Sequence, residues 1–330
     1  MSWKAINQNS VLDFLSYDHA SLHELDQVHD LISWKALNVL LMNLYSKKRG
    51  CPAYPPLMMF KILLLQSWYQ LSDPAMEKQL ARDLLFRRFA GLGLDAPLPD
   101  HSTLWRFREL LIKKRLLDRL FERVNHQLSN SGALIQSGSI SIVDATVIEA
   151  KQSRPKKNKS GQSTQDPEAA YTSKRCANGQ LKTTYGYKAH IQVEEDGFIQ
   201  ALSYGPANEH DSLYLSEVIF DDASLVYADS AYRSKRHDRL LGERNRILYR
   251  AYRNKPLTPD QKRENKKRSA IRSRVEGVFG VLKLHYGFGR ARYLGLARNK
   301  AKAQLIAMSY NIKRALSILQ SCAKWQDHAI

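Results

Sequence analysis

The chain has 330 residues, of which 43% are hydrophobic, and a formal net charge of +19 at pH 7. These values suit one large or two modest globular domains, and the charge predicts a polyanionic partner. No apolar stretch is long enough to span a bilayer, residues 1–17 lack the pattern of a signal peptide, and the three cysteines are scattered, so we expect a cytoplasmic protein without disulfides or structural zinc.

Residues 1–135 are predicted to form an all-helical domain. Behind a strongly apolar helix, Asp73 is placed to cap a helix over 74–89. Ser102 is placed to cap a basic helix over 103–128, in which apolar residues recur at helical spacing. Two short helices before a basic one are compatible with a helix-turn-helix DNA reader, and equally with a domain for packing or dimerisation.

The periodicity then changes, and residues 136–320 are predicted to form an α/β domain. Residues 139–148 alternate like a buried strand, with Asp144 on the same face as three isoleucines. A carboxylate in that place is costly unless a partner compensates its charge. The segment 151–182 is polar, basic and rich in turn-forming residues, so we expect a long excursion that follows DNA phosphates.

Further along, a hairpin over 183–207 is predicted to turn at its Asp-Gly pair, and Asn208 is placed to cap a helix. Residues 224–229 and 246–252 are predicted strands with a helix between them. Together with the first strand, these segments predict a mixed five-stranded sheet with flanking helices. In such a sheet the first and fourth strands can be parallel neighbours.

Two long helices complete the chain before a tail over 321–330. Thr258 and Gln261 have the spacing of a capping box, with a proline at the first helical position, and predict a basic helix that ends near Tyr286. A last helix is predicted over about 299–319.

The positive charge is concentrated in one part of the chain. Between residues 231 and 300, 21 Lys and Arg residues stand against 5 Asp and Glu residues. A solvated basic face and a membrane surface are the other readings of such a cluster, but no basic amphipathic helix stands apart from the predicted fold. The clustering therefore favours nucleic acid as the partner.

Three acids are notable for their placement: Asp144 in mid-strand, Asp229 at a strand end, and Glu276 beside the apolar face of the long basic helix. If the first and fourth strands are parallel neighbours, the two aspartates lie side by side, and a helix on the sheet brings Glu276 over them. Converging carboxylates repel one another unless a cation separates them, and Mg²⁺ prefers such oxygen ligands. We therefore predict a divalent-metal site, while each acid alone could also form a structural ion pair or cap.

On the long helix, Arg272, Glu276 and Lys283 are separated by three and six residues. Other short motifs follow in order, namely YPPLMMFKILLLQ, LPDHSTLWRFR, YGYKAH, NEHDS, YADSAYRS, RYLGLARN and YNIKRAL. This ordered set, from about residue 50 to 320, resembles the bacterial insertion-sequence DDE transposases of the IS-four/IS-five superfamily, which have an RNase H-like core. Ser269 stands where that family's signature has a tyrosine, which leaves the tyrosine's contribution open.

The resemblance implies that Asp144, Asp229 and Glu276 are the catalytic and metal-binding triad, with two Mg²⁺ ions that Mn²⁺ can replace. The implied reaction is hydrolysis of a phosphodiester at the transposon ends, followed by attack of the freed 3′-OH on target DNA. Only 46 residues separate Asp229 from Glu276, too few for the large insertion domain that some relatives carry there. Two other functions stay open: a DNA-binding protein with an idle RNase H-like core, and a metal-dependent nuclease without strand transfer.

The implied partner is double-stranded DNA, at the terminal inverted repeats and at the target, bound by a homodimer at the nucleoid without a membrane or a nucleotide cofactor. His210 could support the active site or form only local hydrogen bonds. Arg272 and Lys283 could pair with Glu276, and Trp105 could belong to the core. The candidate DNA contacts are Arg272, Lys283, Tyr232, Arg233, Arg274, Trp105, Arg106, Arg108, Lys156 and Lys157.

Overall fold

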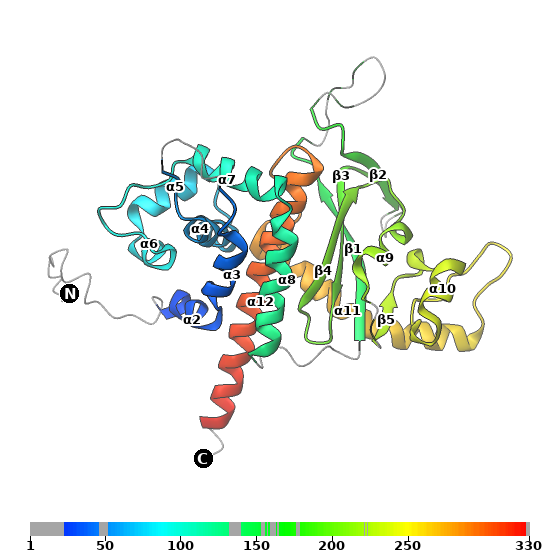
Figure 1. The fold of residues 1–330 in the computed structure, drawn as a ribbon. Helices are drawn as coiled ribbons and strands as arrows, with labels where there is room; N and C mark the ends of the chain where they lie inside the picture. Colours follow the sequence, from blue (N-terminus) through cyan, green and yellow to red (C-terminus); the bar gives the residue numbers. More distant parts are fainter. Residues whose placement is uncertain are drawn as a thin grey trace, which may run out of the picture.

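The computed structural model describes residues 23–45, 52–131, 140–152, 156, 158, 163, 165–175, 179–220, 222 and 224–327. Their elements fall into a helical group and a group built on a sheet, with one long helix between the two (Figure 1). None of the described helices is long and apolar enough to cross a bilayer.

The helical group is built around α4, in which nearly every side chain from Met58 to Trp68 is buried. A helix that is apolar all round must be covered on every side, and α3, α5, α6, α7 and α12 all contact α4. The described helices of this group are α2 (His23–Leu31), α3 (Trp34–Leu41), α4 (Pro56–Trp68), α5 (Asp73–Arg82), α6 (Leu84–Ala90), α7 (His101–Lys113) and α8 (Leu116–Asn130).

The helix between the two groups is α12 (Leu296–Asp327), which packs against α4 and α8 on one side and against β4 (Ile199–Pro206) on the other (Figure 1). Trp68 donates its indole N–H to the carbonyl of Ser309 at 2.8 Å. The buried amide of Asn311 donates to Asn125 at 2.9 Å and to the carbonyl of Ile199 at 2.8 Å. The two groups thus share one hydrophobic core, and the domain boundaries drawn from the sequence stay a prediction.

The second group is built on a mixed sheet of five described strands: β1 (Ile140–Glu149), β2 (Ala170–Arg175), β3 (Leu181–Val193), β4 and β5 (Leu225–Ala228). β3 is antiparallel to β1, β2 and β4, whereas β5 is parallel to β1. The predicted hairpin is confirmed as β3 and β4, with Gly197 in the turn at a φ of 76°. The predicted parallel pairing of the first strand with the strand before Asp229 is confirmed as well.

The fifth strand is not the predicted one. Residues 246–252 run beside β5, where the amides of Arg246 and Leu248 donate to carbonyls of β5, but they form no strand. β2 lies instead in the segment 151–182, which we expected to form a long excursion rather than a strand of the sheet. Its sequence, AYTSKR, has β-forming residues but no alternating apolar side chains, as suits a largely exposed strand. Hydrophobic periodicity therefore could not reveal it.

Two predicted caps are wrong by a small shift. Ser72 rather than Asp73 caps α5, because the Ser72 hydroxyl accepts the amide of Ala75 at 3.2 Å. Asp100 rather than Ser102 caps α7. In both cases the side-chain oxygen accepts a backbone N–H from the first turn of its helix, as an N-cap does.

Two predicted helices are each divided in two. Asp83 has extended backbone between α5 and α6, and its carboxylate accepts the amides of Leu85 and Phe86, so it caps α6. Arg115 separates α7 from α8 with a φ of 51°. Neither residue is a glycine or a proline, so the breaks leave no strong signal in the sequence.

The sheet is covered on both faces. On one face, α11 (Pro259–Tyr286) and α12 contribute to the main core, and α11 starts at the predicted capping box of Thr258 and Gln261. On the other face, α9 (Leu215–Val218), η3 (Ser230–Tyr232) and α10 (Lys235–Leu241) contribute to a smaller core around Val143 and Ala228. Two further short turns, η2 (Asp211–Leu213) and η4 (Gly242–Arg244), lie in the connections.

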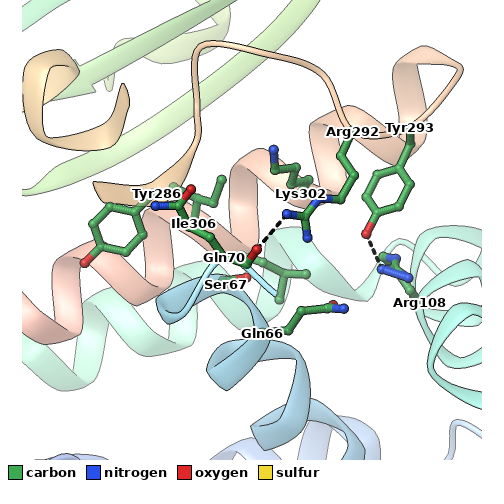
Figure 2. A pocket seen from close by; sticks show the side chains of 10 residues that line it. Gln66, Ser67, Gln70, Arg108, Tyr286, Arg292, Tyr293, Lys302 and Ile306 are labelled. Atoms are coloured by element: carbon green, nitrogen blue, oxygen red, sulfur yellow. Dashed lines mark hydrogen bonds between the residues drawn. The ribbon is translucent and has the colours of Figure 1, made fainter. Parts of the chain in front are cut away.

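Arg108 links the helical group to the loop before α12. Its side chain is 2% exposed, and its guanidinium binds the carboxylate of Asp73 at 2.7 Å. It also donates to the hydroxyl of Tyr293 (Figure 2). Nearby, Arg292 donates to the carbonyls of Gln70 and Leu71. The structure contradicts the prediction that Arg108 contacts DNA, because its guanidinium is engaged inside the protein.

Replacing Arg108 by Met is expected to lower the free energy of unfolding by about 3–5 kcal/mol, because Asp73 loses the cation that compensates its largely buried charge. Urea denaturation monitored by circular dichroism measures the effect. Arg106 lies on the same helix and is exposed, so the control Arg106→Met should change stability by less than about 0.5 kcal/mol. Equal losses in the two variants would contradict the role given to Arg108.

Candidate active site

Asp144 and Asp229 lie side by side on the parallel strands. Val143 of β1 is in register with Ala228, the last residue of β5, and each aspartate follows directly. The carboxylate of Asp144 accepts the amide of Ala145 at 2.9 Å, and that of Asp229 accepts the amide of Ser230 at 2.7 Å. Backbone amides thus fix one oxygen of each carboxylate and leave the other available for a different partner.

Helix α11 brings Glu276 to the same place through Arg272. The guanidinium of Arg272 donates from Nη1 to Oδ2 of Asp144 at 2.7 Å and from Nη2 to Oε1 of Glu276 at 2.8 Å. We call these two contacts the Arg272 bridge. Asp144 and Arg272 have side chains that are 16% and 19% exposed, whereas Glu276 is 57% exposed. The pairing of Arg272 with Glu276, left open by the sequence, is present.

The three acids share one electrostatic environment. Burial raises the pKa of Asp144 above its ordinary value, Arg272 opposes the rise, and the charges of Asp229 and Glu276 add to it. Within the described ranges, however, no three His, Cys, Asp or Glu side chains are grouped closely enough to hold a metal ion. Between Asp144 and Glu276 the compensating positive charge is the guanidinium of Arg272.

An open cleft of about 870 Å³ begins at Asp144 and Glu276 and follows one edge of β1. β5 pairs with this strand only as far as Val143, and the backbone of Glu149 then bonds to Gly289 and Ala291 at 3.0 and 2.7 Å. Residues 144–148 therefore leave a gap in the sheet beside the cleft. The other walls come from α11 and from the paired ends of β2 and β3.

The predicted DNA contacts on and near α11 have different surroundings. Lys283 lines the cleft, where burial and the charge of Lys174 lower its pKa while Asp144 opposes the shift. Arg274 is exposed and pairs with Glu195 at 3.4 Å. Arg233 is half-buried, with its guanidinium 4.4 Å from the centre of the Tyr249 ring. Of these three, only Lys283 lines the cleft.

Tyr232 was predicted to contact DNA, but its side chain is fully buried in the smaller core. Its hydroxyl bonds to Nδ1 of His190 at 2.8 Å, and the His190 ring stacks on Tyr214 with centroids 4.2 Å apart. Burial lowers the pKa of His190 to about 4, so the ring is neutral at pH 7. In this structure Tyr232 supports the sheet behind the acids, and its partner His190 was missed although it ends the YGYKAH motif.

The remaining candidates lie on other parts of the surface. His210 is exposed and caps η2 by accepting the amide of Ser212, so the cap predicted for Asn208 is wrong, and the local role of His210 is the one observed. Trp105 is 44% exposed, which excludes it from the core, and Arg106 beside it is exposed. Lys156 is exposed, while Lys157 lies outside the described residues.

Two family models match the chain. Residues 135–312 match the transposase DDE domain, and residues 11–110 match a transposase domain designated DUF772. The first match spans more than half of the chain and includes Asp144, Asp229 and Glu276. No solved structure gives a significant match.

Replacing Asp144 by Asn is expected to raise the free energy of unfolding at pH 7. The raised pKa of Asp144 means that its ionised form is less favourable in the folded than in the unfolded chain. Such a group contributes stability to the folded chain that is fully present below its unfolded-state pKa. This contribution is lost as the pH rises through its folded-state pKa. The gain over wild type should therefore shrink as urea denaturation is repeated from pH 8 down to pH 4. A variant less stable than wild type at pH 7 would show that the Arg272 bridge outweighs the cost of burial.

Proposed function

Because the chain belongs to the transposases that have a DDE domain, we propose that its cleft is the active site of a DNA transposase with Asp144, Asp229 and Glu276 as catalytic acids. The observation that carries this proposal is one cation shared by Asp144 and Glu276, with Asp229 beside Asp144 at the end of the neighbouring strand. A largely buried acid with a raised pKa that lines an open cleft is typical of a functional site.

The finer classification rests on two features. The spacing of Arg272, Glu276 and Lys283 supports a place in the IS-four/IS-five superfamily. The parallel pairing of β1 with β5, beside the antiparallel β3 and β4, supports an RNase H-like core.

The donor chemistry of the three acids, rather than their present spacing, supports a divalent-metal centre. The guanidinium of Arg272 is a stand-in cation, and it shows that Asp144 and Glu276 can share one positive charge. Carboxylate oxygens are the ligands that Mg²⁺ prefers, and they suit Mn²⁺ as well. We propose that Asp144, Asp229 and Glu276 hold two such ions after Arg272 has turned away from them.

Bound Mg²⁺ ions would stabilise the charge on the attacking and leaving oxygens of a phosphodiester. Asp144 lies in a strand of the sheet, whereas Glu276 is an exposed side chain on α11. Lys283 and the released Arg272 are then available to bind phosphate oxygens in the cleft. The site would first direct water to a phosphodiester at a transposon end and then direct the freed 3′-OH to target DNA.

The proposed partner is double-stranded DNA, at the terminal inverted repeats and at the target. Two transposon ends must be held together during transfer, so we propose that the chain acts as a homodimer in the DNA complex. Of the residues first proposed to contact this DNA, Lys283, Arg274, Arg106, Trp105 and Lys156 are exposed.

Asp144→Asn, Asp229→Asn and Glu276→Gln are each expected to reduce DNA cleavage and strand transfer by a factor on the order of 10³ or more, because each removes charge that holds the metal ions. The assay combines purified protein, Mg²⁺ or Mn²⁺, labelled transposon ends and a plasmid target. The control Asp260→Asn removes an exposed carboxylate elsewhere on α11 and should keep full activity.

The products of the same assay separate three functions. Joined DNA products support the transposase, whereas cleavage without joining would indicate a nuclease. Binding without chemistry by the wild-type protein would indicate an idle core. Full strand transfer by Asp144→Asn would contradict the site itself.

Arg272→Met is expected to tighten Mn²⁺ binding in the absence of DNA by roughly 10- to 100-fold. The guanidinium competes with the ion, and charge-assisted hydrogen bonds contribute about 1.5–3 kcal/mol. Electron paramagnetic resonance of free Mn²⁺ gives the affinity, and the rise in melting temperature on adding Mn²⁺ gives a second reading. Arg274→Met, two residues away and outside the bridge, should behave like wild type. Equal affinities for both variants would contradict the competition.

A further inference from the structure

The paired ends of β2 and β3 form a two-stranded ribbon at the end of the sheet. β1 pairs with β3 over residues 186–193, whereas β2 pairs with β3 over residues 181–186 (Figure 1). The ribbon therefore extends past β1. Because side chains alternate along a strand, residues 172, 174, 182 and 184 project from one of its faces, and all four line the cleft.

On that face two lysines lie directly opposite each other. Lys174 and Lys182 are cross-strand partners, and Thr172 and Thr184 form the neighbouring pair on the same face. Like charges in directly opposite positions destabilise a sheet. In the part of the chain that the structure describes, neither lysine has an ion-pair or hydrogen-bond partner. This lysine pair therefore does not stabilise the ribbon.

A third lysine faces them from the helix across the cleft. Lys283 of α11 lines the same cleft, and the charge of Lys174 is close enough to lower its pKa. The carboxylates of Asp144, Glu149 and Glu276 line the same cleft, and those of Asp144 and Glu276 are bonded to Arg272. Among the described residues Lys174 and Lys182 form no ion pair with these acids, so lysine side chains stand on two facing walls of the cleft, with threonine hydroxyls between the ribbon lysines and the sheet.

We propose that Lys174 and Lys182, facing Lys283 across the cleft, form a phosphate-binding site that holds the DNA backbone alongside the catalytic acids. Ammonium groups on facing walls suit a phosphodiester chain that passes between them, and the hydroxyls of Thr172 and Thr184 add neutral donors. This proposal rests on the proposed function, since it takes DNA as the polyanion. It explains the repulsive lysine pair, because a bound phosphate turns that repulsion into attraction.

The test measures DNA binding without chemistry. Full-length protein is titrated into a fluorescein-labelled duplex of 30 base pairs in EDTA, and anisotropy gives Kd at several NaCl concentrations. For the double variant Lys174→Gln/Lys182→Gln, the slope of log Kd against log salt should fall by about 0.9 for each lost phosphate contact, so by nearly 2. At 0.1 M salt, Kd should rise on the order of tenfold.

Two controls separate this site from net charge. Lys174→Arg/Lys182→Arg keeps both cations and should keep the slope. Lys35→Gln/Lys78→Gln removes the same charge from exposed positions on α3 and α5 and should change the slope less than the ribbon variant does. An equal loss in this control would show that only net charge counts and would overturn the proposal.

A single charge reversal separates binding from folding. Lys174→Glu places opposite charges across the ribbon from Lys182, so the melting temperature should stay the same or rise while DNA affinity falls. A variant that loses affinity only together with stability would overturn the proposal.

Failure of this site differs from failure of the proposed function. If the wild-type protein carries out strand transfer and the double variant Lys174→Gln/Lys182→Gln keeps the wild-type salt slope, the lysine site alone is overturned. If the double variant has a reduced salt slope but the wild-type protein never cleaves DNA, the proposed function is overturned and the lysine site is kept. Wild-type protein that shows no salt-dependent binding to the duplex would overturn both.

Discussion

The candidate site depends on one guanidinium shared by two carboxylates. The Arg272 bridge ties the middle of β1 to α11, and it places one positive charge between the largely buried Asp144 and the exposed Glu276. It also fixes the position of one wall of the cleft, because α11 forms that wall and carries Lys283 about two turns beyond Glu276. The apolar side of the same helix, with Val275 and Phe279, is anchored in the main core. Correct docking of one helix therefore brings together the acids and the positive wall opposite the ribbon.

The parts of the site that could be predicted from the sequence are those marked by a local pattern of apolar and polar residues. Strand alternation singled out Asp144, and the strand end before Asp229 was visible from a short apolar run. The burial of Arg108 could not be foreseen, because its partner Tyr293 lies 185 residues away and no local pattern records such a contact. Arg115, with its positive φ, and β2, without an apolar face, were missed for a related reason: tertiary packing, not local preference, decides both.

The loop between α11 and α12 connects the cleft to the helical group. Gly289 lines the cleft, while Arg292 and Tyr293, a few residues later, bond to residues of the helical group. The amide of Gly295 donates to the buried carboxylate of Asp166 at 3.0 Å, which also accepts the hydroxyl of Tyr187. The loop is thus bonded to the N-terminal helices and to the segment between β1 and β2. The helical group and the cleft are therefore joined through this loop by the chain itself and by hydrogen bonds.

The gap beside β1 also bears on how the protein avoids self-association. An unpaired strand edge is a template for a strand from another copy of the chain. Here the amide of Ala145 donates to the side chain of Asp144, and lysines line the ribbon and the facing helix. An approaching copy would bring the same positive charge to the same place, and the two would repel each other. The lysines proposed to bind DNA would therefore also oppose edge-to-edge pairing of two copies at this gap.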